Sequence, residues 1–304
     1  KDSSVPTLAN SFNVKTWTGN GTYPPNADGS DDITISTDFA PNFVWGKVRT
    51  DTISHILLDS VRGDNKQLST NSTDAQDVRD PDTKPNAYKF ISNGFSVNTW
   101  GNLNNAEDYV GYVWKASDST DILTAGSIDS LASVNDAAGF SIVKYVGNAT
   151  AGATIAHGLS AAPEFMMIKN IDRDGYGWLV YHASRGATKY LVMNTTAGES
   201  TQTSIFNDTA PTSTVFTLGS DTFGNYSGDN YIAYCWRPIS GFSKFGSYDG
   251  NSASDGSGTT QSITTGFQPD LVIIKRYDGT ENWYMQDSAR GSTKQSYANL
   301  TNAE

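Results

Sequence analysis

One pattern occurs three times along this chain of 304 residues, and it constrains the fold more than any other feature. Each copy is a proline-led apolar stretch that ends in lysine and is followed by a turn containing Arg-Gly. The proline precedes the arginine by 21, 22 and 21 residues in the three copies. A spacing held this closely indicates tandem repeats. The residues that define the frame are Pro41, Lys47, Asp59, Arg62, Pro163, Lys169, His182, Arg185, Pro269, Lys275, Asp287 and Arg290.

Two of the three copies continue to a closing segment rich in tyrosine, at residues 108–114 and 230–236. These segments end on Trp114 and Trp236, which follow their arginines by 52 and 51 residues. The third copy has no such segment within residues 1–304. A sandwich without its last strands exposes an unpaired edge. We favour the interpretation that the sequence is part of a longer chain, with strands supplied by a neighbouring chain as the alternative.

The stretches between the repeated segments predict short strands joined by tight turns. Residues 12–17 alternate with a period of two, as in a half-buried strand, and Gly-Asn turns follow. Charged residues make up only 17% of the chain, and the polar remainder is rich in the residues that favour turns. The proline-led stretches are apolar on both faces, which predicts central strands covered on both sides. We therefore predict an all-β fold of tandem antiparallel β-sandwich repeats, jelly-roll-like in character.

The repeats predict the division of the chain into domains. Residues 1–115 form the first sandwich with a polar leader, residues 139–240 the second, and residues 241–304 an incomplete third. Residues 116–138, rich in Ser, Asp and Ala, have no counterpart before the third repeat, so we interpret them as a linker. The junction between the second and third repeats is short. We expect those two repeats to pack in a fixed relation, and the first two to have more freedom.

The titratable residues predict neither catalysis nor metal binding. His182 stands where the sister repeats have Asp59 and Asp287, and such an exchange favours a structural role, hydrogen-bonded to the neighbouring Arg-Gly turn. His55 and His157 lack the spacing of a catalytic triad or a zinc site. The repeated lysines and arginines are expected to form internal ion pairs or to bind the backbone, with anion binding as the alternative. No catalytic residue and no cofactor is predicted.

Two further features are expected to be structural. Cys235 lies in an apolar run and is expected to be a small buried side chain rather than a reactive thiol. Residues 249–256 resemble an oxygen-rich calcium loop but lack the spacing and the closing glutamate of an EF-hand. A flexible turn is the expectation there.

Three tyrosines are candidates for surface recognition, because Tyr23, Tyr176 and Tyr226 lie in turns beside Gly, Asn or Pro. Aromatic side chains in the loops of a sandwich can stack on sugar rings. A carbohydrate-binding, lectin-like module of a secreted or surface protein is therefore an alternative function. A glycan depolymerase is a third, although no carboxylate pair is singled out.

The charge of the chain limits its partners. The formal net charge of −11 disfavours nucleic acid or an anionic membrane as the main partner. No apolar run approaches the roughly 20 residues needed to span a bilayer, so membrane insertion is not expected.

Several longer segments resemble a repeat found in virion proteins of tailed, often marine, bacteriophages. The resemblance rests on residues 139–145, 162–170, 181–191, 229–236 and 241–248 and covers nearly the whole chain. It implies a virion structural protein, either a tail fibre, a tail-associated adhesin or another surface appendage that contacts the host. The implied partners are copies of itself, other virion proteins and a host-surface glycan or protein, after assembly in the bacterial cytoplasm. The resemblance carries no catalytic motif, so we expect no enzyme.

Overall fold

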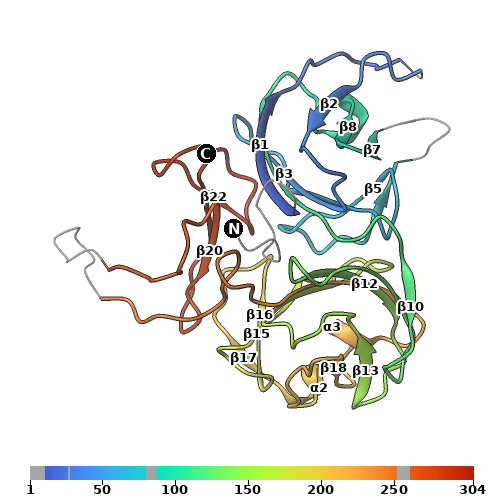
Figure 1. Ribbon diagram of the computed structural model, residues 1–304, viewed down its shortest axis with the longest axis vertical. Coiled ribbons are helices and arrows are strands. Elements are labelled where there is room, and N and C mark those ends of the chain that lie inside the picture. The colour runs from blue at the N-terminus through green and yellow to red at the C-terminus, as the bar shows by residue number, and fades with distance from the viewer. Residues whose placement is uncertain (1–10, 27, 80–86, 252–260) are drawn as a thin grey trace.

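The computed structural model describes residues 11–26, 28–79, 87–251 and 261–304, and these form antiparallel sheets with almost no helix. The predicted all-β sandwich fold is confirmed. We name the three repeats unit 1 (residues 11–114), unit 2 (residues 121–236) and unit 3 (residues 241–304). In Figure 1 they surround a common centre, with unit 1 in blue to green, unit 2 in green to orange and unit 3 in red.

Unit 1 is a sandwich of two sheets. Its main sheet has the order β1-β9-β3-β4, formed by β1 (Phe12–Thr18), β9 (Asp108–Trp114), β3 (Phe43–Val48) and β4 (Ile56–Asp59). The second sheet has the order β2-β8-β7, formed by β2 (Ile33–Ser36), β8 (Gly94–Val97) and β7 (Tyr88–Ile91). The remaining elements are the hairpin of β5 (Lys66–Gln67) and β6 (Asp77–Val78) and the 3₁₀ helix η1 (Thr99–Gly101). The proline-led strand β3 is thus central, between the closing strand β9 and β4.

Unit 2 repeats this arrangement on a longer main sheet. The order is β10-β11-β12-β19-β14-β15-β16-β17, and a second sheet pairs β13 (Ala153–Ala156) with β18 (Val215–Leu218). Two single-turn helices, α2 (Thr203–Phe206) and α3 (Thr222–Asn225), flank β18. The strands of the main sheet are β10 (Asp121–Leu123), β11 (Ser130–Asn135), β12 (Phe140–Val146), β19 (Asn230–Trp236), β14 (Phe165–Asn170), β15 (Leu179–His182), β16 (Lys189–Val192) and β17 (Ser200–Thr201).

The linker predicted over residues 116–138 is wrong, because this segment contains β10 and β11. All six residues of β11 pair with β12, and Ala132 is buried in the core of unit 2. The serines that suggested a linker are part of this packing: Ser130 donates to the carbonyl of Ala156 and Ser133 to that of Ser117, both at 2.8 Å. A strand whose buried positions are Ala and Ser resembles a linker in composition alone.

Unit 3 has three strands, β20 (Leu271–Lys275), β21 (Trp283–Asp287) and β22 (Ser296–Tyr297). The opening strand expected at residues 241–245 is not formed, and residues 262–264 also lie outside any strand. The opening strand does not form because it lacks a strand to pair with. In units 1 and 2 the opening strand pairs with the closing strand, and no third closing strand exists within residues 1–304.

The proline-led strands of the two complete main sheets, β3 and β14, are buried on both faces, as predicted. In β3 every residue is buried: Val44 faces the core between the two sheets of unit 1, whereas Phe43 and Trp45 face the other way. The side chains on that second face meet those of units 2 and 3 in one cluster, which we call the central core. Its members include Phe43, Trp45, Tyr112, Phe140, Met167, Trp178, Tyr234, Trp236, Trp283 and Met285.

The central core packs aromatic rings across unit boundaries. The ring of Phe43 lies 4.5 Å from that of Tyr234 and 5.9 Å from that of Phe140. The two closing tryptophans, Trp114 and Trp236, meet edge to face at 5.9 Å. Units 1 and 2 are therefore packed directly together, contrary to the freedom that a linker would give them.

We predict that Phe43→Ala destabilises units 1 and 2 together. The side chain is fully buried, and deleting a buried phenylalanine side chain costs about 3–5 kcal/mol. Urea unfolding followed by near-ultraviolet circular dichroism should give one cooperative transition, shifted to lower urea. Ile122→Ala, at a side chain that is 71% exposed, is the control and should change the free energy of unfolding by less than about 0.5 kcal/mol. Two transitions, only one of them shifted, would contradict a shared core.

Candidate functional site

The repeated aspartate and arginine form a buried ion pair that closes a turn. Asp59 accepts the backbone N–H of Arg62 at 2.8 Å, and its second oxygen accepts from the Nε of the same arginine. Asp287 and Arg290 repeat both bonds at 2.9 and 2.6 Å. Each arginine side chain is 1% exposed and each aspartate side chain fully buried. The expected internal ion pairs are thus present, and both charges are used within the fold.

The glycine after each arginine is required by the backbone. Gly63, Gly186 and Gly291 have φ values of 90°, 76° and 86°. A side chain at such a left-handed position is disfavoured by steric contact with the backbone. The Arg-Gly dipeptide is therefore explained by turn geometry.

In unit 2 the equivalent turn is stabilised by different side chains. The Nδ1 of His182 accepts from the N–H of Ser184 at 3.2 Å, and its distance to the Ser184 hydroxyl is 3.0 Å. The hydrogen bonding to the neighbouring turn that was predicted for the histidine is present. Arg185 pairs instead with Glu199, at 2.6 and 3.0 Å.

Glu199 belongs to a repeated position that sequence reasoning missed. It lies 14 residues after its arginine, and the same offset gives Gln76 in unit 1 and Glu304 in unit 3. Each of these side chains accepts from the arginine of its own unit. The constant offset of 14 residues is the signal in the sequence, but Gln and Glu are common residue types that do not by themselves indicate a buried contact.

The same repeated position links each unit to the next. Its backbone N–H donates to the carbonyl two residues after the repeated lysine of the following unit, and the third such bond returns from unit 3 to unit 1. The three units therefore close into a ring with pseudo-threefold symmetry (Figure 1). The bonds are Gln76 to Ile171 at 3.0 Å, Glu199 to Tyr277 at 2.7 Å and Glu304 to Arg49 at 2.9 Å.

A second set of equivalent bonds crosses the three junctions. The indole N–H of Trp178 donates to the carbonyl of Ser69 at 2.8 Å, and that of Trp283 to the carbonyl of Val192 at 3.2 Å. At the corresponding place in unit 1, the Nε2 of His55 lies 2.8 Å from the carbonyl of Tyr297.

His55 is neutral and oriented by its neighbour. Its Nδ1 accepts from the indole of Trp45 at 2.9 Å, so the proton lies on Nε2 and points to the carbonyl of unit 3. Burial lowers the pKa of His55 to about 3. The histidine thus takes the donor role that tryptophan has at the other two junctions.

Tyrosine hydroxyls from the closing strands complete the ion pairs across the junctions. Tyr234 of unit 2 donates to Asp59 of unit 1 at 2.7 Å, and Tyr112 of unit 1 donates to Asp287 of unit 3 at 3.0 Å. Burial raises the pKa of both tyrosines, so the hydroxyls remain protonated donors. The spacing of the repeated residues in the sequence does not predict this bond between a closing strand and the preceding unit.

The repeated lysines bind backbone carbonyl groups, which was one of the expectations from the sequence. The Nζ of Lys169 lies 2.6 Å from the carbonyl of Tyr176 and 3.1 Å from that of Thr73 in unit 1. Lys275 donates to Thr196 of unit 2 and to two carbonyls of its own unit, and Lys47 to two carbonyls of unit 1. Burial lowers the pKa of both Lys47 and Lys169 to about 8.

The other frame residues are structural too. Pro41, Pro163 and Pro269 each lie two residues before a central strand, where no ladder bond is lost. Cys235 is buried, as expected, and burial raises the pKa of its thiol to about 12.

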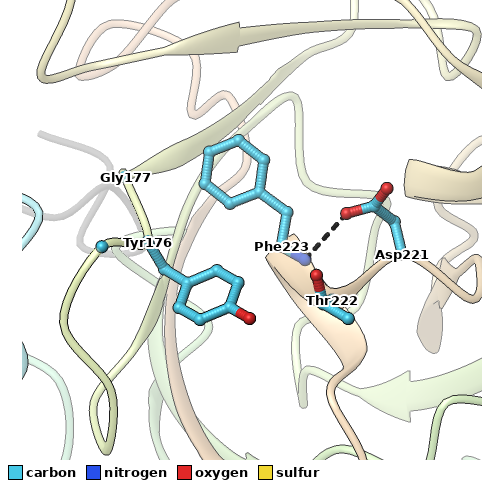
Figure 2. Close-up of a pocket in the computed structure, with 6 residues that line it drawn as sticks. Tyr176, Gly177, Asp221, Thr222 and Phe223 are labelled. Atoms are coloured by element: carbon cyan, nitrogen blue, oxygen red, sulfur yellow. Dashed lines mark hydrogen bonds between the residues drawn. The ribbon is translucent and has the colours of Figure 1, made fainter.

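The three candidate tyrosines do not come together in one site. Tyr23 is 75% exposed in unit 1, and Tyr226 lies under the guanidinium of Arg173 at 4.3 Å. Tyr176 borders an open hollow of about 240 Å³ on unit 2, opposite the ring of Phe223 (Figure 2).

The carboxylate beside this hollow is already engaged. Asp221 accepts from the N–H of Phe223 at 2.8 Å through one oxygen (Figure 2) and from Gln202 at 2.5 Å through the other. The hollow thus offers two aromatic rings and no free carboxylate.

The described residues hold no group of three or more His, Cys, Asp or Glu side chains that could bind a metal ion. Residues 252–260, which include most of the calcium-like loop, lie outside the described residues. Within the described part, no helix has the length and apolar character to cross a membrane.

We predict that Lys169 makes stability depend on pH between 8 and 10.5. Its pKa is about 8 in the folded protein and 10.5 for an ordinary lysine, so the unfolded chain binds more protons in this window. The free energy of unfolding should therefore rise with pH, relative to Lys169→Met, by up to about 3 kcal/mol. Chemical denaturation of both proteins at several pH values measures this. A difference that stays constant from pH 8 to 10.5 would contradict the lowered pKa.

We also predict that substitutions of Trp45 and His55 are coupled in their effect on the free energy of unfolding. The positions of Trp45 and His55 are occupied by Met167 and Trp178 in unit 2 and by Ile273 and Trp283 in unit 3. The tryptophan is therefore at the first position in unit 1 and at the second position in the other two units, and the core is filled in each case. His55→Trp alone should overpack the core and destabilise by about 2 kcal/mol, and Trp45→Met alone should leave a cavity. The double variant should recover at least about 1 kcal/mol relative to the sum of the single variants. A double-mutant cycle by urea unfolding measures this coupling, and simple additivity would contradict it.

Comparison with known proteins shows the family of the chain. No curated protein and no solved structure matches the chain. One family model matches residues 8–304, nearly the whole sequence. The chain therefore belongs to that family, which is described as a domain of unknown function, DUF7483.

Proposed function

We propose that this chain is a non-enzymatic structural component of a tailed-bacteriophage virion, in a tail fibre or another surface appendage. The observation that carries the proposal is the use of the repeated polar residues. Among the described residues, the repeated arginines pair with carboxylate or amide side chains of their own units, and the repeated lysines bind carbonyl groups. Because these repeated residues stabilise the turns and the junctions of the three units, they are suited to a rigid structural protein.

The pseudo-threefold ring supports the same proposal. Oligomers with closed symmetry use one interface repeatedly, and here a single chain repeats one junction three times. Such a module matches the threefold axis of a trimeric fibre, on which it would stack with copies of itself or with other virion proteins. The resemblance of the repeats to phage virion proteins gives the assembly its biological setting, with assembly in the bacterial cytoplasm.

Host contact is proposed for the turns in which the units differ. The frame is common to all units, so specificity belongs to variable loops, such as those of Tyr23 and Tyr176. A host-surface glycan or protein is the proposed target. The acidic net charge of −11 favours a partner that is not itself strongly anionic.

The test is the location of the chain on particles. Antibodies against the recombinant chain should label purified virions in electron microscopy, and peptides of the chain should appear in their mass spectra in several copies per particle. Antibody against an unrelated host protein is the control. Virions that lack both the label and the peptides would overturn the proposal.

Glycan binding is the second candidate, supported by the hollow between Tyr176 and Phe223. Two aromatic rings beside an open hollow can stack on a sugar ring. A glycan array probed with the chain should then give a signal that Tyr176→Ala weakens by about tenfold, whereas Ile122→Ala, at an exposed side chain that does not line the hollow, leaves it unchanged. A blank array, or equal loss in both variants, would remove this candidate.

A further inference from the structure

The central strand of unit 3 differs from its two counterparts in having a free edge. Strand β3 lies between β9 and β4, and β14 lies between β19 and β15. Strand β20 pairs only with β21 among the described residues. All residues of β3 and β14 are buried, whereas none of β20 is, and Ile274 is 37% exposed.

Two further segments of unit 3 lack the strand that pairs with their counterparts: residues 241–245 match β1 and β12, which pair with the closing strands, and residues 262–264 match β2 and β13, which pair with β8 and β18. Residues 241–245 contribute Phe242 and Phe245 to the edge of the central core without forming a strand. Ile263, the counterpart of Ile155 in β13, is 50% exposed, whereas Ile155 is fully buried. Three separate segments therefore lack the partner that their counterparts have.

The polar pattern of the ring points to the same place. The closing-strand tyrosines of units 2 and 1 bind Asp59 and Asp287 of the preceding units. The third position of this kind is His182, on unit 2 next to unit 3. Its Nδ1 accepts from the Ser184 N–H, which leaves the proton on Nε2, and no hydrogen bond to Nε2 is present among the described residues.

Arg185 beside it is also less covered than its counterparts. Its side chain is 24% exposed, against 1% for Arg62 and Arg290. Its guanidinium lies over the ring of Tyr277 of unit 3 at 3.7 Å, and no closing strand covers this turn among the described residues.

We propose that the free edge of β20 binds a strand of the same kind as β9 and β19, supplied from outside residues 1–304. By the register of β9 on β3, its terminal tryptophan lies opposite Leu271 and its second tyrosine opposite Ile273. The hydroxyl of that tyrosine accepts from the Nε2 of His182. This is strand addition to a sheet edge, in which the backbone gives affinity and the side chains give specificity.

A second copy of residues 1–304 does not supply this strand from its β9 or its β19. Its β9 is paired with β1 and β3, and its β19 with β12 and β14. Neither strand is free to leave without unfolding its own unit. The occupant is therefore an additional strand with the pattern Tyr-x-x-Tyr-x-Trp.

A fluorescein-labelled peptide that copies residues 107–115, including β9, tests the proposal. Fluorescence anisotropy should report saturable one-to-one binding to the 304-residue chain. Hydrogen exchange measured by mass spectrometry should slow by about tenfold or more in residues 271–275 when the peptide is bound. A peptide carrying Tyr112→Ala and Trp114→Ala is the matched control and should not bind. His182→Ala in the chain should weaken binding by about fivefold.

Three results would overturn the proposal. One is binding that leaves exchange in residues 271–275 unchanged. Another is the absence of binding both for the peptide and for a copy of residues 200–236 joined covalently after Glu304, which is equivalent to Glu199. The third is a concentration-dependent dimer in sedimentation analysis that protects residues 271–275 by itself, because a second copy would then occupy the edge.

Discussion

The structure depends on the central core, in which one face of each main sheet meets the other units. A β-strand presents alternate side chains to opposite faces, so β3 and β14 divide their residues between a core inside the unit and the central core. Phe43, Tyr234 and Trp236 pack across the boundary between units 1 and 2. Removing one unit would expose this aromatic surface to water, so the units stabilise one another.

Because the central core excludes water, the charged side chains beside it need partners within the protein. A charge taken out of water costs free energy unless it is paired and hydrogen-bonded. Asp59 and Arg62 are paired with each other, and Tyr234 of the next unit donates to the carboxylate. Lys169 has no carboxylate partner among its hydrogen bonds and donates to carbonyl groups instead. Burial away from water disfavours its charged form and lowers its pKa to about 8. The polar frame thus sets the orientation of each unit on its neighbour.

The sequence alone was sufficient for the parts of the fold that depend on local pattern. The repeat, the two-faced central strands and the hydrogen bonding of His182 to its turn could be predicted from spacing and alternation. Strand β11 could not, because Ser130 and Ser133 are buried through bonds to carbonyls distant in sequence. The ring could not be predicted either, because the bond from Glu304 to Arg49 joins the two ends of the repeat array. The contacts of the turn tyrosines also depend on tertiary packing.

The most direct test of the closed ring is the exchange rate of its three junction amides. Native-state hydrogen exchange by nuclear magnetic resonance should give the same opening free energy for Gln76, Glu199 and Glu304, close to that of global unfolding. All three N–H groups donate across equivalent junctions, and opening any one requires separation of two units. Rapid local exchange at Glu304 with global protection at Gln76 would contradict the account, because the units would then form an open row.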